Sequence, residues 1–159
     1  MVAVHPPVSE IWSWLGEIPD PEVPALSIVD LGIVRDVRWA EDGSELVIAI
    51  TPTYSGCPAI DAISSDIHAA MRAHGIDSLK LEERLSPPWT TDWMSDEAKE
   101  KLKAYGIAPP ALISIAEPVR CPHCGSNRTQ MLSRFGSTAC KALFKCLSCL
   151  EPFDVFKRH

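Results

Sequence analysis

The sequence lacks the motifs that mark nucleotide-binding, hydrolytic and metalloprotease enzymes. It contains no G-x-x-x-x-G-K-[ST], no G-x-G-x-x-G, no H-E-x-x-H and no G-x-S-x-G. No apolar run approaches the ~20 residues of a membrane helix, and the first residues show no basic stretch followed by an apolar core. No nucleotide-binding or hydrolase machinery is visible, and we expect a protein that resides in the cytoplasm and has no membrane segment.

Cysteine is scarce in the larger, N-terminal part of the chain, where Cys57 stands alone before residue 119. The other five cysteines all follow residue 120: Cys121, Cys124, Cys140, Cys146 and Cys149. Disulfides among these five could not stabilise the N-terminal part. In a reducing compartment, cysteines in Cys-x-x-Cys pairs are better interpreted as metal ligands than as disulfide partners.

Composition and charge indicate a globular chain with two dissimilar parts. Hydrophobic residues make up 46% and charged residues 23% of the 159 residues, a balance typical of folded proteins. Residues 1–118 carry a net charge of −11, whereas residues 119–159 carry +5. With the prolines before residue 119, this predicts a domain over 1–106, a linker over 107–118 and a small module over 119–159.

The N-terminal part shows alternating helix and strand signals. Apolar spacing and turn residues predict the following elements in order: a helix over 9–17, strands over 33–39 and 45–51, a helix over 58–74 and a strand over 79–82. Asp42-Gly43 favours a hairpin between the first two strands. We expect an α+β fold, a small open sheet in the order α-β-β-α-β with helices on one face. A further helix should begin after Ser95.

The C-terminal part carries two Cys-x-x-Cys pairs, Cys121 with Cys124 and Cys146 with Cys149, separated by 21 intervening residues. This spacing is typical of a zinc ribbon in which four thiolates surround one ion. With no ligand position left open, the zinc should be structural. Iron in the same geometry, disulfides and free thiols remain the alternatives.

Cys57 follows the second strand at the point where a helix should begin, which we predict to be the helix N-cap. Unpaired amides and the helix dipole at such a position lower the pKa of a thiol and favour the reactive thiolate. A buried, inert core cysteine is an equally weighted alternative. Cys140 remains after the ribbon ligands are assigned and is a second candidate, although packing against the ribbon would explain it as well.

Three carboxylates, Asp20, Glu22 and Asp30, cluster in a proline-rich loop before the first strand. Carboxylates in such a loop could be metal ligands, but loop caps and solvated charges are commoner. The sequence alone leaves both interpretations open.

Two sets of motifs resemble known families. The stretches 20–24, 27–34 and 56–58 resemble the small domain of iron–sulfur assembly factors of the SufT type. Nearly the whole chain resembles the PaaD family of phenylacetate-degradation proteins, and four stretches are specific for it: 51–58, 88–94, 105–110 and 135–154. The resemblance implies an accessory subunit of the multicomponent phenylacetyl-CoA epoxidase, a di-iron oxygenase that is served by an iron–sulfur flavin reductase.

By this resemblance, Cys57 holds or passes iron or a transient iron–sulfur cluster, with the three carboxylates nearby. We therefore expect a maturation factor whose partners are the epoxidase components, above all the reductase, with the ribbon as a docking module. The alternative is a structural or regulatory subunit that carries no cluster. Nucleic-acid binding is disfavoured because the ribbon has few basic residues and the body is acidic. The sequence leaves a homodimer open.

Overall fold

The computed structural model describes residues 4–111 and 118–158. Its contacts divide the chain into two compact units, Met1–Trp89 and Thr90–His159, which we call the N-terminal unit and the ribbon unit. Each contains one sheet, of three and four strands respectively. No helix in the described residues combines the length and apolar character needed to cross a bilayer.

The N-terminal unit is a three-stranded sheet with two helices. Its elements are α1 (Val8–Leu15), β1 (Val34–Trp39), β2 (Leu46–Ile50), α2 (Ala59–Ala73) and β3 (Leu79–Glu83). The central strand β2 is antiparallel to β1 and parallel to β3. The α+β class and the α-β-β-α-β order confirm the sequence prediction, and every boundary lies within two residues of the expected one.

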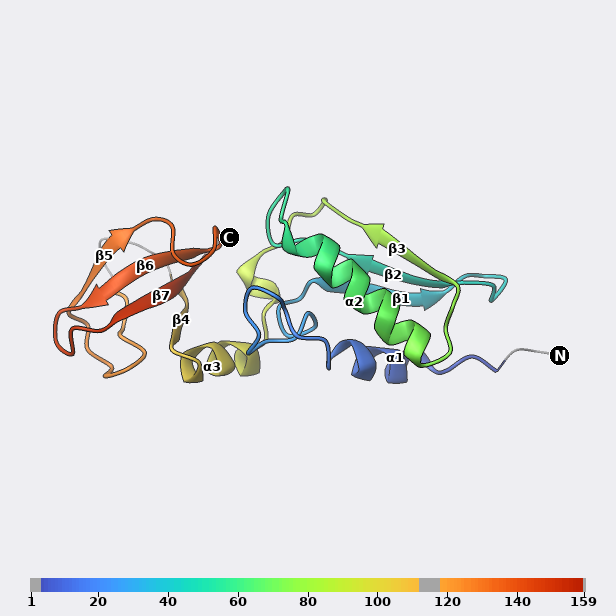
Figure 1. Ribbon diagram of the computed structural model, residues 1–159, viewed down its shortest axis with the longest axis horizontal. Helices are drawn as coiled ribbons and strands as arrows, with labels where there is room; N and C mark the ends of the chain where they lie inside the picture. Colours follow the sequence, from blue (N-terminus) through green and yellow to red (C-terminus); the bar gives the residue numbers. More distant parts are fainter. Residues whose placement is uncertain (1–3, 112–117, 159) are drawn as a thin grey trace. The chain divides into compact units, whose positions relative to one another are not determined.

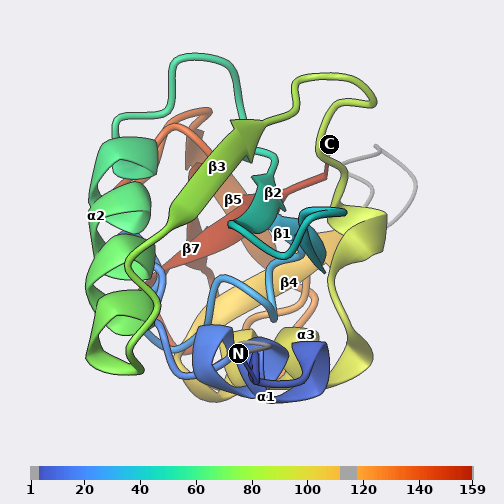
Figure 2. The same cartoon turned by 90° about the vertical axis from the view of Figure 1, so that its right-hand side faces the viewer.

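Both helices cover the same face of this sheet (Figures 1 and 2). α1 contacts α2 and β1, and α2 contacts β3. The register explains the packing, because Ile48 of β2 lies between Val37 and Leu81 in one apolar row. Ile48 is fully buried. Alternation along the strands thus places one apolar row beneath the helices.

The opposite face of the sheet is charged. Val47 lies between Arg38 and Lys80 in register, and the next residue on this face, Ala49, lies between Asp36 and Glu82. Arg38 pairs with Asp36 at 2.6 Å and with Glu82 at 3.1 Å. Val47 and Ala49 are nevertheless buried, since long charged side chains cover apolar surface with their stems. β2 is therefore apolar on both faces although only one face carries helices.

Two loops of the N-terminal unit are tied to its core by hydrogen bonds. The amide of Thr51 donates to the carbonyl of Ile33 at 2.8 Å. The indole Nε1 of the buried Trp89 donates to the carbonyl of Leu31 at 2.8 Å. The loop before β1 is thereby fixed from two sides, by the segment after β2 and by the segment after β3.

The ribbon unit joins a short helix to a four-stranded sheet. Its elements are η1 (Thr91–Trp93), α3 (Asp96–Ala104), β4 (Ile107–Ala111), β5 (Thr129–Ser133), β6 (Lys141–Cys146) and β7 (Pro152–Lys157). The sheet order is β4-β7-β6-β5. Ser95 caps α3 as predicted, its hydroxyl accepting from the amide of Ala98 at 3.0 Å.

The division between the units differs from the expected domain boundary at residue 106. The predicted linker begins with Ile107–Ala111, but these residues form β4, which pairs in parallel with β7. α3 contacts β4 and therefore belongs to the ribbon unit. Pro109 and Pro110 suggested a break, yet an edge strand tolerates proline because one side of its backbone needs no partner. Residues 112–117 of the predicted linker lie outside the described residues.

Candidate functional site

Four cysteine sulfurs meet where β6 ends in the ribbon unit. The Sγ atoms of Cys121 and Cys149 are 3.7 Å apart, and those of Cys124 and Cys146 are 3.6 Å apart. All four sulfurs lie within 4.8 Å of one another. A tetrahedral ion with Zn–S bonds of about 2.3 Å requires sulfurs about 3.8 Å apart, whereas a disulfide requires about 2.05 Å. The arrangement fits a metal-binding four-thiolate site.

The two Cys-x-x-Cys turns share one backbone conformation. The amide of Cys121 donates to the carbonyl five residues later at 2.9 Å, and the amide of Cys146 does the same at 2.9 Å. Each second cysteine is followed by a residue with positive φ, Gly125 at 75° and Leu150 at 66°. Glycine adopts this conformation readily, but a leucine is strained in it. The Cys-x-x-Cys spacing alone gave no signal for the conformation of Leu150.

Backbone amides polarise the sulfur of Cys146. The amides of Cys149 and Ser148 each lie 3.4 Å from it. These hydrogen bonds lower the pKa of Cys146 to about 6, and the bond from the amide of Cys149 has the largest effect. For Cys149, the amide of Glu151 lowers the pKa, but burial and the neighbouring sulfurs raise it to about 12. Four crowded thiols cannot all ionise without a cation, so a bound metal is what would let all four be thiolates.

Cys57 lies directly before α2, in the segment that follows β2. The helix begins at Ala59 with Pro58 as its N-cap, so Cys57 precedes the cap and does not occupy it as predicted. Its amide donates to the carbonyl of Tyr54 at 3.3 Å, which closes a tight turn. Cys57 is only 6% exposed. Of the two interpretations that the sequence left open, this burial matches the core cysteine.

The carboxylates of the proline-rich loop are used largely to hold the loop itself. Asp20 is buried, and its Oδ1 accepts from the amides of Glu22 at 2.9 Å and Val23 at 2.8 Å. Asp30 and Ser27 bond reciprocally, each side chain accepting from the other's amide at 3.0 Å. For Asp20 and Asp30, the loop-cap interpretation describes these contacts.

Glu22 connects the proline-rich loop with the segment that contains Cys57. The Tyr54 hydroxyl donates to Glu22 Oε1 at 3.4 Å. Sequence reasoning gave Tyr54 no role; its place three residues before Cys57 in a polar turn was the available signal. Cys57 and the three carboxylates do not form a group of three or more ligand atoms, because within the described ranges only the ribbon cysteines do so.

Cys140 stands apart from the four-thiolate site. It is buried, and its sulfur lies 3.0 Å from the Thr138 hydroxyl. Its carbonyl accepts from the amide of Lys157 at 2.9 Å, so the residue is part of the ribbon packing. This position agrees with the packing alternative.

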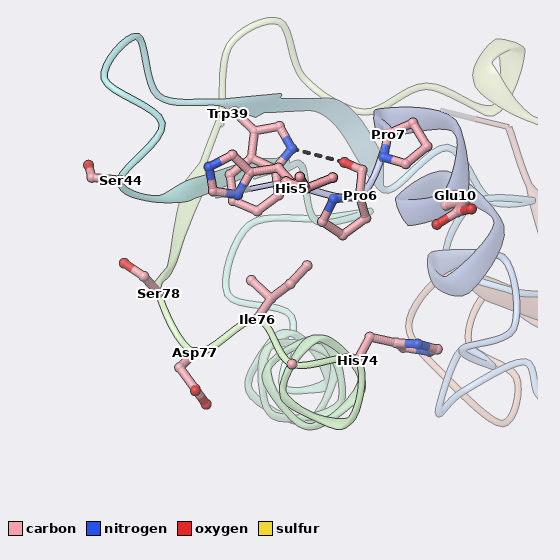
Figure 3. A pocket seen from close by; sticks show the side chains of 12 residues that line it. His5, Pro6, Pro7, Glu10, Trp39, Ser44, His74, Ile76, Asp77 and Ser78 are labelled. Atoms are coloured by element: carbon pink, nitrogen blue, oxygen red, sulfur yellow. Dashed lines mark hydrogen bonds between the residues drawn. The ribbon is translucent and has the colours of Figure 1, made fainter. Parts of the chain in front are cut away.

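A groove of about 660 Å³ opens in the N-terminal unit between the arm that precedes α1 and the segment that follows α2 (Figure 3). His5 stacks on Trp39 with ring centroids 4.1 Å apart, and the Trp39 indole donates to the carbonyl of Pro6 at 3.2 Å. None of the candidate residues from the sequence lines this groove. Its lining comes from segments far apart in the chain, which no local motif could have joined.

Comparisons with known proteins assign each unit to a class. Residues 9–76 match the family described as "Iron-sulfur cluster assembly protein", and residues 109–157 match the "PaaD zinc beta ribbon domain". A domain of unknown function, DUF59, from Bacillus anthracis is 31% identical with a TM-score of 0.54, covering 59% of this chain and 89% of that one. A conserved hypothetical protein from Thermotoga maritima is 28% identical with a TM-score of 0.52, covering 62% and 95%. The class is thus an iron–sulfur assembly domain followed by a zinc ribbon.

Two curated relatives narrow the class further. The chain is 51% identical to a subunit of the "Putative 1,2-phenylacetyl-CoA epoxidase" of Escherichia coli (strain K12), over 99% of this chain and 97% of that protein. It is 36% identical to the "Fe-S protein maturation auxiliary factor YitW" of Bacillus subtilis (strain 168), over 54% of this chain and 82% of that protein. The chain belongs to the PaaD family, as its motifs predicted.

Proposed function

We propose that this protein is a non-catalytic accessory factor of a phenylacetyl-CoA epoxidase system, which assists iron–sulfur cluster assembly or transfer to the reductase component. The single observation that carries the proposal is the match of residues 9–76 to iron–sulfur cluster assembly proteins in a chain that is 51% identical to an epoxidase subunit. The similarity to a maturation auxiliary factor from Bacillus subtilis supports the same role.

Cys57 is the ligand we propose for the cargo. Its sulfur is buried, but Ser55 and Gly56 directly before it are exposed, and nothing lies within 4 Å of a Cβ placed on Gly56. A local opening of this surface loop would uncover the thiol without disturbing the apolar row under the helices. Iron would then pass to the acceptor by ligand exchange, an acceptor thiolate replacing that of Cys57 with no change of oxidation state.

We propose that the three carboxylates act mainly by holding the loops around Cys57. Asp20 and Asp30 fix the proline-rich loop, and Glu22 links that loop to Tyr54. Loss of the Tyr54–Glu22 contact would loosen the turn before Cys57. In this proposal the three residues control access to the sulfur, with Glu22 the carboxylate that is joined directly to this turn.

The ribbon cysteines Cys121, Cys124, Cys146 and Cys149 hold a structural zinc in this proposal. The support is the sulfur spacing, the four-cysteine donor set and the match to a zinc β-ribbon. Four protein ligands leave no position for substrate, so the ion supplies folding free energy and no chemistry. Cys140 has no ligand role here because it is packed away from the four sulfurs.

The test is anaerobic reconstitution with ferrous iron and sulfide, followed by activation of the apo-reductase. We expect the wild-type protein to develop charge-transfer absorbance and to activate the reductase. Cys57→Ala should lose both, by about tenfold or more in activation rate, since loss of even a residue that only orients a metal ligand typically costs about 10–100-fold. Cys140→Ala is the matched control, because Cys140 is also buried and lies outside the four-thiolate site.

Metal content separates loss of the cargo ligand from loss of the fold. All three proteins should contain one zinc per chain, and Cys140→Ala should behave as wild type in both assays. Equal activation by wild type and Cys57→Ala would refute the role of Cys57.

The low exposure of Cys57 favours a second candidate, a structural or regulatory subunit that binds the oxygenase without carrying a cluster. Under this candidate, co-purification with the epoxidase components survives Cys57→Ala, and epoxidase activity is unchanged when the reductase has been matured independently. The first proposal instead requires activity to fall with the reductase's cluster content.

A further inference from the structure

The two edges of the ribbon sheet are built differently. β4 forms one edge and contains Pro109 and Pro110, which have no N–H to offer an added strand. β5 forms the other edge, and its five residues, Thr129–Ser133, include neither proline nor a charged residue. Natural edge strands usually carry such protection against pairing with other chains. In the described part of this sheet β4 and β5 are the two edge strands (Figure 1), and only the β4 edge is blocked by proline.

Apolar side chains are exposed along the β5 edge. Met131 is 43% exposed, Leu132 is 52% exposed, and Phe135 just beyond the strand is 66% exposed. The register with β6 shifts between Met131 and Ser133, which makes Leu132 the extra residue of a bulge. The bulge limits regular pairing to the part of β5 before Leu132. The edge therefore offers a short run of backbone hydrogen-bonding groups. The exposed side chains of Met131, Leu132 and Phe135 border it and form what we call the apolar margin.

Basic residues surround this edge. Arg128 and Arg134 flank the strand and are exposed, and within the described part of the chain neither side chain forms an ion pair. Lys145 of β6 lies beside Gln130 in register, and the Lys157 ammonium lies 4.3 Å from the centroid of the Phe135 ring. Residues 119–159 carry a net charge of +5. An incoming segment with acidic flanks would meet complementary charge at both ends.

We propose that the β5 edge binds an extended segment of a partner protein by strand addition, and that this segment carries apolar side chains flanked by aspartate or glutamate. Backbone hydrogen bonds would supply affinity, and the apolar margin together with Arg128 and Arg134 would supply selectivity. The surface is independent of cluster handling at Cys57.

A second copy of this chain is a poorer occupant. An antiparallel β5–β5 pair centred on Met131 would set Arg128 of each copy opposite Arg134 of the other. A parallel pair would bring the same arginines beside their equivalents. Both arrangements bring like charges together, which disfavours self-association.

The test uses the zinc-loaded full-length protein and two synthetic peptides that share a valine–isoleucine–valine core, one flanked by aspartates and the other by lysines. We expect the aspartate peptide to shift the backbone amide resonances of residues 128–134 and to bind about tenfold more tightly than the lysine peptide, since two exposed ion pairs contribute at this scale. Binding should weaken as salt rises.

Leu132→Lys should abolish binding by placing a charge on the edge, and Arg128→Glu combined with Arg134→Glu should reverse the preference to the lysine peptide. Tyr105→Lys is the matched control, because Tyr105 is exposed in the same unit but lies outside β5 and outside the two Cys-x-x-Cys turns; it should bind as wild type does. Shifts that survive Leu132→Lys, no preference between peptides, or no shift at the highest soluble peptide concentration would overturn the proposal. Dimerisation that Leu132→Lys removes would also overturn it, by assigning the edge to a second copy. Cluster reconstitution on Leu132→Lys should remain as wild type, so failure here leaves the proposed function standing.

Discussion

The N-terminal unit and the ribbon unit achieve stability by different means. Of the twelve largest fully buried side chains in residues 4–111 and 118–158, all except Phe156 belong to the N-terminal unit. The core of the ribbon is a cluster of small and aromatic side chains that includes two cysteines of the four-thiolate site, Cys121 and Cys146. The N-terminal unit therefore buries a core without a metal, whereas the ribbon core and the metal site are one structure.

This difference indicates which of the two units depends on a bound metal for its stability. A module of the ribbon's size buries a smaller fraction of its surface than a large domain does, and metal binding then contributes to its folding free energy. The N-terminal unit carries 5 Lys and Arg against 14 Asp and Glu, and the ribbon unit carries 10 against 7. The two units thus also differ in the sign of their charge, −9 and +3, and in the surfaces that they offer to partners.

The largest expected effect is that of removing the metal. Structural zinc contributes on the order of 10 kcal/mol in small modules, so a strong chelator should unfold the ribbon and leave the N-terminal unit folded. Two-dimensional NMR with hydrogen exchange checks this: resonances of β5–β7 should collapse while amides of β2 stay protected. Cys146→Ser should reproduce the effect without chelator, and Cys140→Ala should not. If the ribbon resonances persisted after verified metal loss, the ribbon unit would not depend on the metal for its fold.

A cavity in the sheet of the N-terminal unit should destabilise that unit and spare the ribbon unit. Ile48 is fully buried at the centre of β2, and Ile→Ala at such sites costs about 2–5 kcal/mol. Ile48→Ala should lower the denaturant midpoint of the N-terminal unit and leave zinc content at one per chain. Phe144→Ala in the ribbon core is the reciprocal variant and should weaken zinc retention instead. A loss of zinc from Ile48→Ala would mean that the two units do not unfold independently.

The elements of both units could be predicted because their signals are local. Apolar spacing located α1 and α2, the β2 run located the central strand, and the paired Cys-x-x-Cys spacing located the metal site. β4 was missed because its prolines resemble a linker signal, and the pairing with β7 that stabilises it is remote in sequence. The contact-based division after Trp89 differs from the predicted boundary at residue 106 for the same reason.

The candidate loop site was predicted less well, since its geometry depends on tertiary contacts. The strand-to-helix position of Cys57 was correct to one residue, but its burial is set by the turn through Tyr54, which no spacing reveals. Asp20 and Asp30 look like metal ligands in sequence and cap the loop in the structure. Side-chain oxygens serve both purposes, so residue type alone could not separate the two roles.

The two Cys-x-x-Cys turns allow a smaller effect to be isolated inside the ribbon. Leu150 holds a positive φ of 66° where the equivalent residue of the other turn is Gly125. Because a left-handed conformation costs a non-glycine residue about 1–2 kcal/mol, Leu150→Gly should strengthen zinc retention by about 1 kcal/mol, measured by competition with a chromophoric chelator. Gly125→Leu should weaken it by a similar amount. Unchanged retention in both variants would mean that the turns are not conformationally equivalent.

The smallest expected effect concerns the charged outer face of the N-terminal sheet. A hydrogen bond from Arg38 is the main cause that lowers the pKa of Glu82 below its ordinary 4.5, and Arg84 contributes less. A carboxylate with a depressed folded pKa stabilises the fold above its unfolded pKa, and this contribution is lost as pH falls through the folded pKa. Arg38→Ala should therefore raise the pKa of Glu82 in a carboxyl NMR titration and flatten the acid side of the stability profile. Arg84→Ala should do so less, and high salt should shrink both differences. If the pKa of Glu82 shifted equally in the two variants, the Arg38 hydrogen bond would not be the main cause of its depression.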